Sequence, residues 1–303
     1  MEKISQDLQK KGIETTYINS VDFTYNYKSI WDKIYNFFSK TFLKKNVKKT
    51  FRNDQTLKKC HSLDLQDYIL VVNPSHFSTK VINVLRKKTN HFYCLNYDSL
   101  ERSPIVKEII LLFDKIFSFD PKDVENHSFL YPTTNFNYLD KHKNYSNEKD
   151  AFIVILGDAF REQILHKLAD VLIQKKCNNF DFVVVNSKQT KKHPNFNYLQ
   201  HNIPLNEVFN KMKRAKILID IVHNNQTGVS FRVFEAMALG KKIITNNPSV
   251  KLYDFYNPNN ICIIDENNIA ISEEFLSSPY EELPEEIYQK YTLSQWTKNI
   301  FNL

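Results

Sequence analysis

The residue types and spacings best suited to chemistry are concentrated in residues 226–247, which read QTGVSFRVFEAMALGKKIITNN. Gln226, Thr227 and Gly228 stand at the start of a run with helical periodicity. A helix N-terminus presents unpaired N–H groups and a partial positive charge. Thr227 is the predicted N-cap, and Gly228, which opens the helix, would let a phosphate approach the backbone closely. The sequence therefore predicts an anion-binding site at this point.

Three polar side chains, Ser230, Arg232 and Glu235, interrupt the apolar pattern of the same predicted helix, residues 228–239. Arg232 and Glu235 are three positions apart, so they share a helix face. A cation and a carboxylate on one face near a helix N-terminus suit a phosphate and a vicinal diol. The same pair on an ordinary helix would be a solvated salt bridge of little energetic value, and the local pattern leaves both interpretations open.

A second candidate follows an apolar strand predicted over residues 151–156. Gly157 ends that strand, and Arg161 falls in the first turn of the next predicted helix. The helix dipole disfavours a cation there, which indicates a bound anion, although a surface arginine would give the same pattern. The chain has no Walker A or G-x-G-x-x-G sequence, which argues against a P-loop NTPase or a simple dehydrogenase.

A third set of polar residues follows the predicted strands of the N-terminal half. His76 comes after YILVVN, and Asp98 comes after FYCLN. Either could serve as a general acid or base, as could Asp22 after the predicted strand 13–19. A lone histidine is more often structural or merely exposed, and the sequence does not separate these roles.

Apolar strands alternate with helices along the whole chain, which predicts parallel sheets covered on both faces. We expect two tandem doubly wound, Rossmann-like α/β domains with a ligand cleft between them. The expected N-terminal domain comprises residues 1–145, with a polar linker at 139–150. The expected C-terminal domain comprises residues 146–284, and the helices of 285–303 are expected to pack back toward the N-terminal domain.

The net charge of +7 is unevenly distributed. Residues 28–59 carry ten Lys/Arg and two Asp, whereas residues 260–289 carry eight Asp/Glu and no Lys/Arg. Within the basic region, residues 25–52 predict amphipathic helices that could meet an anionic membrane surface or a lipid-linked acceptor. A helix docked on its own domain with a solvated basic face is the alternative. No nucleic-acid-binding motif accompanies the charge, so no nucleic-acid partner is predicted.

The N-terminus lacks the apolar core of a signal peptide, and no run of about 18 apolar residues occurs. The four cysteines lie far apart, without metal-ligand or redox spacing. These features predict a cytoplasmic protein, with any membrane contact peripheral. No D-x-D carboxylate pair is present either, so metal-independent chemistry without a cofactor is expected.

The segment 226–247 resembles the donor-site segment of bacterial GT-B glycosyltransferases that build lipopolysaccharide, capsule and other surface glycans, in which a helix reads roughly G-x-S-x-R-x-x-E-A-x-x-x-G. The motif-level resemblance covers residues 151–301. It implies a sugar-nucleotide donor held by the C-terminal domain and a glycan or lipid-linked glycan as acceptor. It further implies that Glu235 binds the nucleotide ribose and that Arg161 neutralises the leaving phosphate.

The remaining donor contacts that the resemblance implies come from Gln226, Thr227, Gly228 and Ser230, with Arg232 supporting Glu235 or touching a phosphate and Gly157 lining the site. Catalytic candidates are therefore Arg161 and Glu235, with His76 added from the strand-end pattern.

Two features depart from the family pattern. Retaining members often carry two glutamates eight positions apart, and Thr227 stands where the first would be. The chain also opens with a predicted helix, where such domains usually open with a strand. These departures leave the stereochemistry and the catalytic base open. They also keep an alternative function in view, that of a non-catalytic sugar- or nucleotide-binding subunit of a glycan-synthesis complex.

Overall fold

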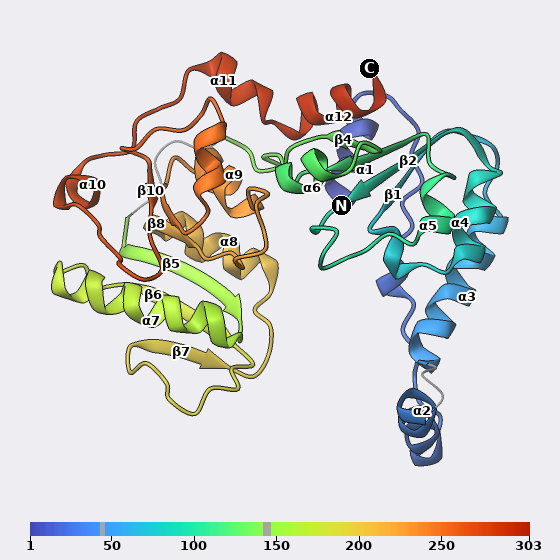
Figure 1. Ribbon diagram of the computed structural model, residues 1–303, viewed down its shortest axis with the longest axis horizontal. Coiled ribbons are helices and arrows are strands. Elements are labelled where there is room, and N and C mark those ends of the chain that lie inside the picture. The colour runs from blue at the N-terminus through green and yellow to red at the C-terminus, as the bar shows by residue number, and fades with distance from the viewer. Residues whose placement is uncertain (43–45, 142–146) are drawn as a thin grey trace. The chain divides into compact units, whose positions relative to one another are not determined.

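The computed structural model describes residues 1–42, 46–141 and 147–303. Contacts divide the chain into two compact units, Met1–Thr133 and Thr134–Leu303. Figure 1 shows a separate sheet in each unit. The predicted domain boundary, between residues 145 and 146, lies outside the described residues. The packing of helices 285–303 against the N-terminal domain stays a prediction.

The first unit is built on a parallel sheet with the strand order β1-β2-β3-β4. Its strands are β1 (Gln66–Val72), β2 (Thr89–Asn96), β3 (Lys115–Ser118) and β4 (Leu130–Pro132). The helices that connect them in turn are α4 (Thr79–Arg86), α5 (Lys107–Ile110) and α6 (Pro121–Asn126). Alternate residues of β2, Phe92 and Cys94, pack with Ile82 of α4 and Ile109 of α5 in one buried core. The strand order of this sheet never reverses within the described chain.

Four elements precede this sheet: α1 (Glu2–Lys10), η1 (Ser20–Asp22), α2 (Ile30–Phe42) and α3 (Val47–His61). The predicted strand over residues 13–19 is wrong, because those residues belong to no strand. Their last residue, Asn19, instead caps η1 by accepting a hydrogen bond from the backbone N–H of Val21. In the described parts of the chain, no helix is both long and apolar enough to cross a bilayer.

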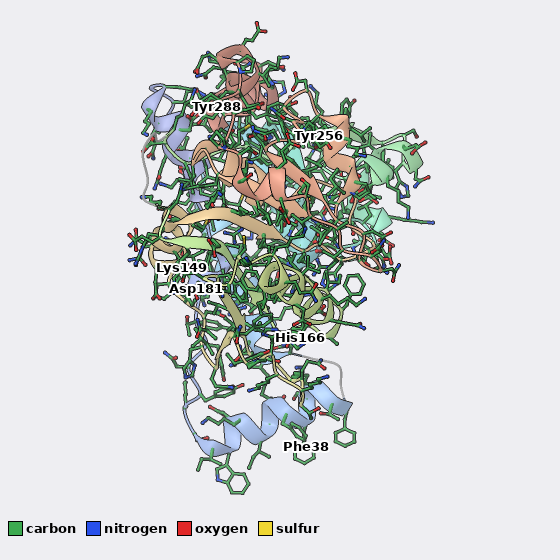
Figure 2. All side chains as sticks on the ribbon, turned by 90° about the vertical axis from the view of Figure 1, so that its left-hand side faces the viewer. Phe38, Lys149, His166, Asp181, Tyr256 and Tyr288 are labelled. Atoms are coloured by element: carbon green, nitrogen blue, oxygen red, sulfur yellow. The ribbon has the colours of Figure 1, made fainter. Side chains whose placement is uncertain are left out.

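The second unit contains a six-stranded parallel sheet with the order β10-β9-β8-β5-β6-β7. Its strands are β5 (Lys149–Leu156), β6 (Asp181–Val185), β7 (Phe196–Leu199), β8 (Ala215–Asp220), β9 (Lys242–Thr245) and β10 (Ile261–Ile263). Figure 2 shows Lys149 and Asp181 close together at the amino ends of β5 and β6. From β5 the chain adds β6 and β7 on one side, and from β8 it adds β9 and β10 on the other side. The direction of the strand order therefore reverses between the neighbours β5 and β8.

Helices cover both faces of this second sheet. The helices of the second unit are α7 (Ala159–Gln174), α8 (Leu205–Arg214), α9 (Phe231–Ala238), α10 (Glu273–Ser277), α11 (Glu285–Lys290) and α12 (Leu293–Phe301). Alternate residues of β5 point to opposite faces, as the period of a strand requires. Ile153 and Ile155 pack on the side of α7 and α10, and Phe152 packs on the side of α8, α9 and α11.

Parallel α/β architecture is therefore confirmed in both units. Two short elements of the second unit, β7 and α10, had no counterpart among the predicted elements. β7 is a four-residue edge strand in which Asn197 breaks the apolar run, so its pattern is too short and too polar to mark a strand.

Gly157 is required by a close approach of neighbouring backbone. Its N–H donates to the carbonyl of Val185 at 2.6 Å. A Cβ built at Gly157 would lie 2.5 Å from Ser187 Cα and 2.7 Å from the carbonyl oxygen of Asn186. Asn186 itself adopts a left-handed φ of 55°, which turns the chain at the end of β6. The structure thus gives Gly157 a packing role between β5 and β6.

Gly157→Ala is expected to lower the free energy of unfolding by about 2–3 kcal/mol, because two backbone segments must separate to admit the methyl group. Urea unfolding would measure the loss. The same substitution at Gly12 is the control, since nothing lies within 4 Å of its added Cβ and its φ is +80°. That variant should lose only about 1 kcal/mol. A loss at Gly157 no larger than at Gly12 would contradict the packing role.

Candidate functional site

The sequence-predicted donor residues meet where the second sheet reverses. Arg161 follows β5, and the loop of residues 221–230 follows β8. The strands β5 and β8 are paired neighbours in the sheet. In open parallel sheets, ligands bind outside the carboxyl ends of the strands at such a switch point. The topology therefore brings the two segments that the sequence singled out to neighbouring strand ends at the carboxyl edge of the second sheet.

A buried carboxylate lies at this switch point. Asp220 ends β8 and is 7% exposed. One of its oxygens accepts a hydrogen bond from Ser230 Oγ at 2.8 Å, and the other accepts one from Thr245 Oγ1 at 3.1 Å. These bonds join the end of β8 to the start of α9 and to the end of β9.

Burial raises the pKa of the Asp220 carboxyl. The hydrogen bonds from Ser230 and Thr245, and then the positive charges of Arg232 and Arg161, act in the opposite direction. Arg232 belongs to α9 and Arg161 to α7, so two guanidinium groups from different helices act on one carboxylate. The geometry thus gathers two cations at the switch point.

The helix α9 begins one residue after Ser230, which is its N-cap. The hydroxyl of Ser230 accepts a hydrogen bond from the backbone N–H of Arg232 at 3.2 Å while it donates to Asp220. The prediction that Gly228 opens the helix with Thr227 as N-cap is wrong. The Ser230 hydroxyl donates its hydrogen bond to Asp220, so an oxygen lone pair remains to accept from the helix N–H.

The loop before α9 is held by side-chain amides. Asn247 Nδ2 donates to the carbonyls of Thr227 and Gly228 at 3.3 and 3.1 Å. Gln226 Nε2 also donates to the carbonyl of Gly228, at 3.2 Å. The backbone that leads into the helix is therefore held by Asn247, two residues after β9, and by Gln226 of the loop itself. Contact of Gln226, Thr227, Gly228 and Ser230 with a donor stays a prediction.

Glu235 is buried, with 6% of its surface exposed. It accepts a short hydrogen bond from the hydroxyl of Tyr138, and its other oxygen lies 3.7 Å from Nη1 of Arg232. Burial raises the pKa of the Glu235 carboxyl, an effect opposed by Arg232 and by the Tyr138 hydrogen bond. The predicted pairing of Arg232 and Glu235 is confirmed, with a buried carboxylate and a partly buried guanidinium rather than a solvated pair.

Arg232 has unused hydrogen-bonding capacity. Its Nη1 atom is buried and has no hydrogen-bond partner among the described residues. A buried guanidinium N–H without an acceptor is costly, and a ligand oxygen would satisfy it. Arg161 is held at the end of β5: its Nη2 donates to the carbonyl of Leu156 at 3.1 Å, and its Nε lies 3.8 Å from Asp158.

A short connecting segment, residues 134–139, contacts both the site and the C-terminal helices. Asn135 Nδ2 donates to the carbonyl of Val229 at 2.9 Å, just before the N-cap of α9. Asn137 Nδ2 donates to the hydroxyl of Tyr288 at 2.6 Å, and the backbone N–H of Asn137 donates to the carbonyl of Tyr291 at 2.7 Å. The connecting segment therefore links α9 to the helices of residues 285–301.

The histidine candidate belongs to the first unit. His76 is exposed and lies in the short helix η2 (Pro74–His76), directly after β1. Asp98 follows β2, pairs with Arg102 at 3.4 Å and lies at the same sheet edge, because β1 and β2 are parallel. Catalysis by His76 stays a prediction, as does a role for Asp22, which accepts a hydrogen bond from Asn19 at 2.8 Å.

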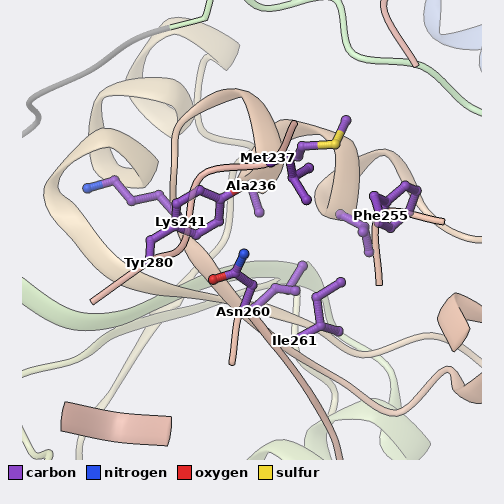
Figure 3. Close-up of a pocket in the computed structure, with 10 residues that line it drawn as sticks. Ala236, Met237, Lys241, Phe255, Asn260, Ile261 and Tyr280 are labelled. Atoms are coloured by element: carbon purple, nitrogen blue, oxygen red, sulfur yellow. The ribbon is translucent and has the colours of Figure 1, made fainter. Parts of the chain in front are cut away.

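Another face of α9 lines a pocket (Figure 3), and none of the predicted site residues is in its wall. Its walls are mainly apolar, and burial in its rim lowers the pKa of Lys241 to about 8. That lysine donates to Asn147 Oδ1 at 2.8 Å. Because Arg232 and Glu235 are not part of the wall, this pocket is separate from the switch-point site. The other lining residues are Val233, Ala236, Met237, Ile243, Phe255, Asn260, Ile261, Tyr280 and Leu283.

Residues 1–42, 46–141 and 147–303 contain no group of three or more His, Cys, Asp and Glu side chains that could hold a metal ion. Metal-independent chemistry stays a prediction.

Sequence reasoning missed two residues of the site. Asp220 lies within the apolar run KILIDIV of residues 216–222 and is not among the predicted site residues, although a carboxylate near the end of a buried strand is itself a signal. Tyr138 gave no signal, because it is 97 residues from Glu235 in the chain.

Asp220→Asn is expected to make stability less dependent on pH. The raised pKa means that the folded chain holds this proton more tightly than the unfolded chain. The free energy of unfolding therefore falls as pH rises from about 4 toward the raised pKa. Urea unfolding at a series of pH values should give a shallower fall for the variant. Asp67→Asn, at an exposed carboxylate, should keep the wild-type slope. Equal slopes for Asp220→Asn and wild type would contradict the assignment.

No protein-family model and no curated protein sequence matches the chain. Solved structures do resemble it. An α-glucosyltransferase in complex with UDP and a 13-mer DNA containing an HMU base matches with a TM-score of 0.60 and 14% identity, over 99% of this chain and 93% of that one.

Two further structures match over the whole of this chain. A UDP-forming α,α-trehalose-phosphate synthase from Burkholderia xenovorans has a TM-score of 0.52 and 11% identity, with 85% of that chain covered. A complex of S. aureus MnaA with UDP has a TM-score of 0.50 and 12% identity, with 91% of that chain covered. At such identities the likeness concerns the fold. The chain has the GT-B-like architecture of two tandem Rossmann-like sheets.

Proposed function

We propose that the protein is a glycosyltransferase that takes a sugar from a uridine diphosphate donor and transfers it to a glycan or lipid-linked glycan. The observation that carries the proposal is the convergence of Arg161, Arg232 and Glu235 on the switch point of the second sheet, around Asp220. Two cations and one diol-binding carboxylate match the charged and hydroxylated parts of a nucleoside diphosphate.

The cations suit the diphosphate. Nη1 of Arg232 is buried and lacks an acceptor in the described chain, and a phosphate oxygen would supply one. Arg161 follows β5 and is tethered to its end through the carbonyl of Leu156. Charge grows on the diphosphate as the sugar leaves, so fixed guanidinium groups and the N-terminus of α9 would stabilise the transition state more than the ground state.

Glu235 suits the ribose. A carboxylate can accept hydrogen bonds from both hydroxyls of a vicinal diol. One oxygen of Glu235 already accepts from Tyr138, and the other faces Arg232. The hydroxyl of Tyr138 occupies the place at Glu235 where we expect a ribose hydroxyl. Donor binding would therefore displace this hydroxyl or add further hydrogen bonds to the carboxylate.

Uridine is the proposed nucleotide because the similar structures point to it. The α-glucosyltransferase and MnaA were each solved with UDP, and the trehalose-phosphate synthase is UDP-forming. The proposed acceptor, a surface glycan such as lipopolysaccharide or capsule, rests on the resemblance of residues 226–247. His76 is the proposed acid–base candidate, since it follows a strand end of the first unit.

UDP is expected to stabilise the protein, and Glu235→Ala is expected to abolish that effect. At about 100 times its Kd, a ligand specific for the folded state adds about 2.7 kcal/mol. Differential scanning fluorimetry with UDP, GDP, ADP, dTDP and CMP would measure it. Glu235→Gln preserves the shape of this buried side chain and should also lose most of the shift. Glu207→Gln, at an exposed position of α8, is the control. A full shift in both Glu235 variants would refute the assignment.

Arg161→Lys is expected to reduce sugar transfer about 100-fold while changing UDP affinity much less, because the fixed guanidinium acts mainly on the developing charge. Single-turnover assays with radiolabelled UDP-sugars and lipid extracts would separate the two effects. Arg214→Lys, at an exposed residue of α8, should retain full activity.

A protein that binds UDP but neither transfers nor hydrolyses any UDP-sugar would instead be the non-catalytic binding subunit.

A further inference from the structure

The helix α2 places its polar side inward and its apolar side outward. Ser39 is 3% exposed. Asn36, on the same side, donates to the hydroxyl of Tyr27 at 2.7 Å and accepts from the backbone N–H of Val47 at 3.1 Å. Asp32 accepts from the backbone N–H of Lys28 at 2.9 Å. The contacts that position α2 on the first unit are thus made by polar groups.

The opposite side of α2 is apolar and faces outward. Trp31, Phe37 and Phe42 are 77%, 64% and 72% exposed. Figure 2 shows Phe38 on the outer side of the helix, where its ring stacks on Phe42 with centroids 5.7 Å apart. Such a concentration of exposed aromatic rings on one helix face marks an interaction surface. The large exposed apolar side chains that α2 carries are Ile30, Trp31, Ile34, Tyr35, Phe37, Phe38 and Phe42.

Basic residues border this apolar face. Lys33 and Lys40 are exposed and lie beside Phe37, because positions 33, 37 and 40 share one side of a helix. The following helix, α3, adds five more basic residues: Lys48, Lys49, Arg52, Lys58 and Lys59. Asn53 of α3 accepts from the backbone N–H of Ser78 at 2.6 Å, which attaches this basic region to the start of α4.

We infer that α2 docks in the plane of an anionic lipid bilayer, with its apolar face among the acyl chains and the lysines at the headgroups. An interfacial helix has this combination of a broad aromatic face and a basic rim. A symmetric contact between two copies would bring the basic α2 and α3 regions together, which like charge opposes. Nucleic acid would complement the positive charge of the lysines, but it has no apolar phase in which Ile30 and Ile34 could be buried. This inference goes beyond glycosyl transfer and does not depend on it.

The full chain is expected to co-sediment with vesicles of phosphatidylcholine and phosphatidylglycerol at least about tenfold more tightly than with phosphatidylcholine alone, because each lysine near the surface adds to the attraction. The triple variant Trp31→Ser/Phe38→Ser/Phe42→Ser should bind at least about 100-fold more weakly. Leu111→Ser/Leu252→Ser is the matched control, since these leucines are 92% and 74% exposed on other elements and should not matter.

The lysine rim has its own test. Lys33→Gln/Lys40→Gln should weaken binding to anionic vesicles about tenfold, whereas Lys80→Gln/Lys107→Gln, at exposed positions of α4 and α5, should leave it unchanged.

Tryptophan fluorescence reports the depth of docking directly. The chain has two tryptophans, and Trp31 is 77% exposed whereas Trp296 is 4% exposed. Anionic vesicles should shift the tryptophan emission to the blue. The Trp31→Phe variant should lose that shift but should still co-sediment with the vesicles.

Three results would overturn the inference. One is equal vesicle binding by wild type and the triple variant. Another is a dimer in light scattering that the triple variant abolishes, with no vesicle binding. The last is binding to DNA oligonucleotides without binding to vesicles. Because no nucleotide is present in these assays, a negative result leaves the proposed donor site untouched.

Discussion

The carboxylate of Asp220, held out of water at the end of a central strand, is the constraint on which the candidate site depends. A buried charge without partners is unstable. Here the partners are Ser230 at the N-cap of α9, Arg232 of the same helix, Thr245 of β9 and Arg161 of α7. Satisfying this one group fixes where α9 begins and how its first turn meets the sheet. The start of α9 sets the position of Arg232 in its first turn, while Arg161 is held by the carbonyl of Leu156 at the end of β5.

Charge balance follows from this arrangement. Arg232 stands between Asp220 and Glu235, both buried and both with raised pKa. Each carboxylate is compensated by the same guanidinium, and each also accepts a hydroxyl hydrogen bond, from Ser230 and from Tyr138. The buried charges of the site are therefore balanced before any ligand arrives, although a donor hydroxyl would still have to displace that of Tyr138 from Glu235.

Local pattern and spacing were enough to predict the parallel sheets and the Arg232–Glu235 pair, because strand burial and the i,i+3 relation are local properties. The start of α9 was predicted too early, since Thr227 and Ser230 are both good caps and only the distant Asp220 favours Ser230. Tyr138 was beyond prediction for the same reason, as its partner lies in another part of the chain. For α2, the amphipathic pattern was correct, but periodicity alone does not say which side is buried. The structure buries Ser39 and leaves Phe42 in solvent.

The connecting segment of residues 134–139 couples two events that are distant in sequence. Tyr138 competes with any ligand hydroxyl for Glu235, while Asn137, one residue earlier, is bonded to Tyr288 and Tyr291. In the proposed function, a donor hydroxyl would displace Tyr138, the neighbour of the residue that anchors the C-terminal helices. If that displacement also loosened the bonds of Asn137, thermodynamic reciprocity would apply: whatever loosened those helices would strengthen donor binding by the same factor. Donor binding and order at the C-terminus would then be linked through two adjacent residues.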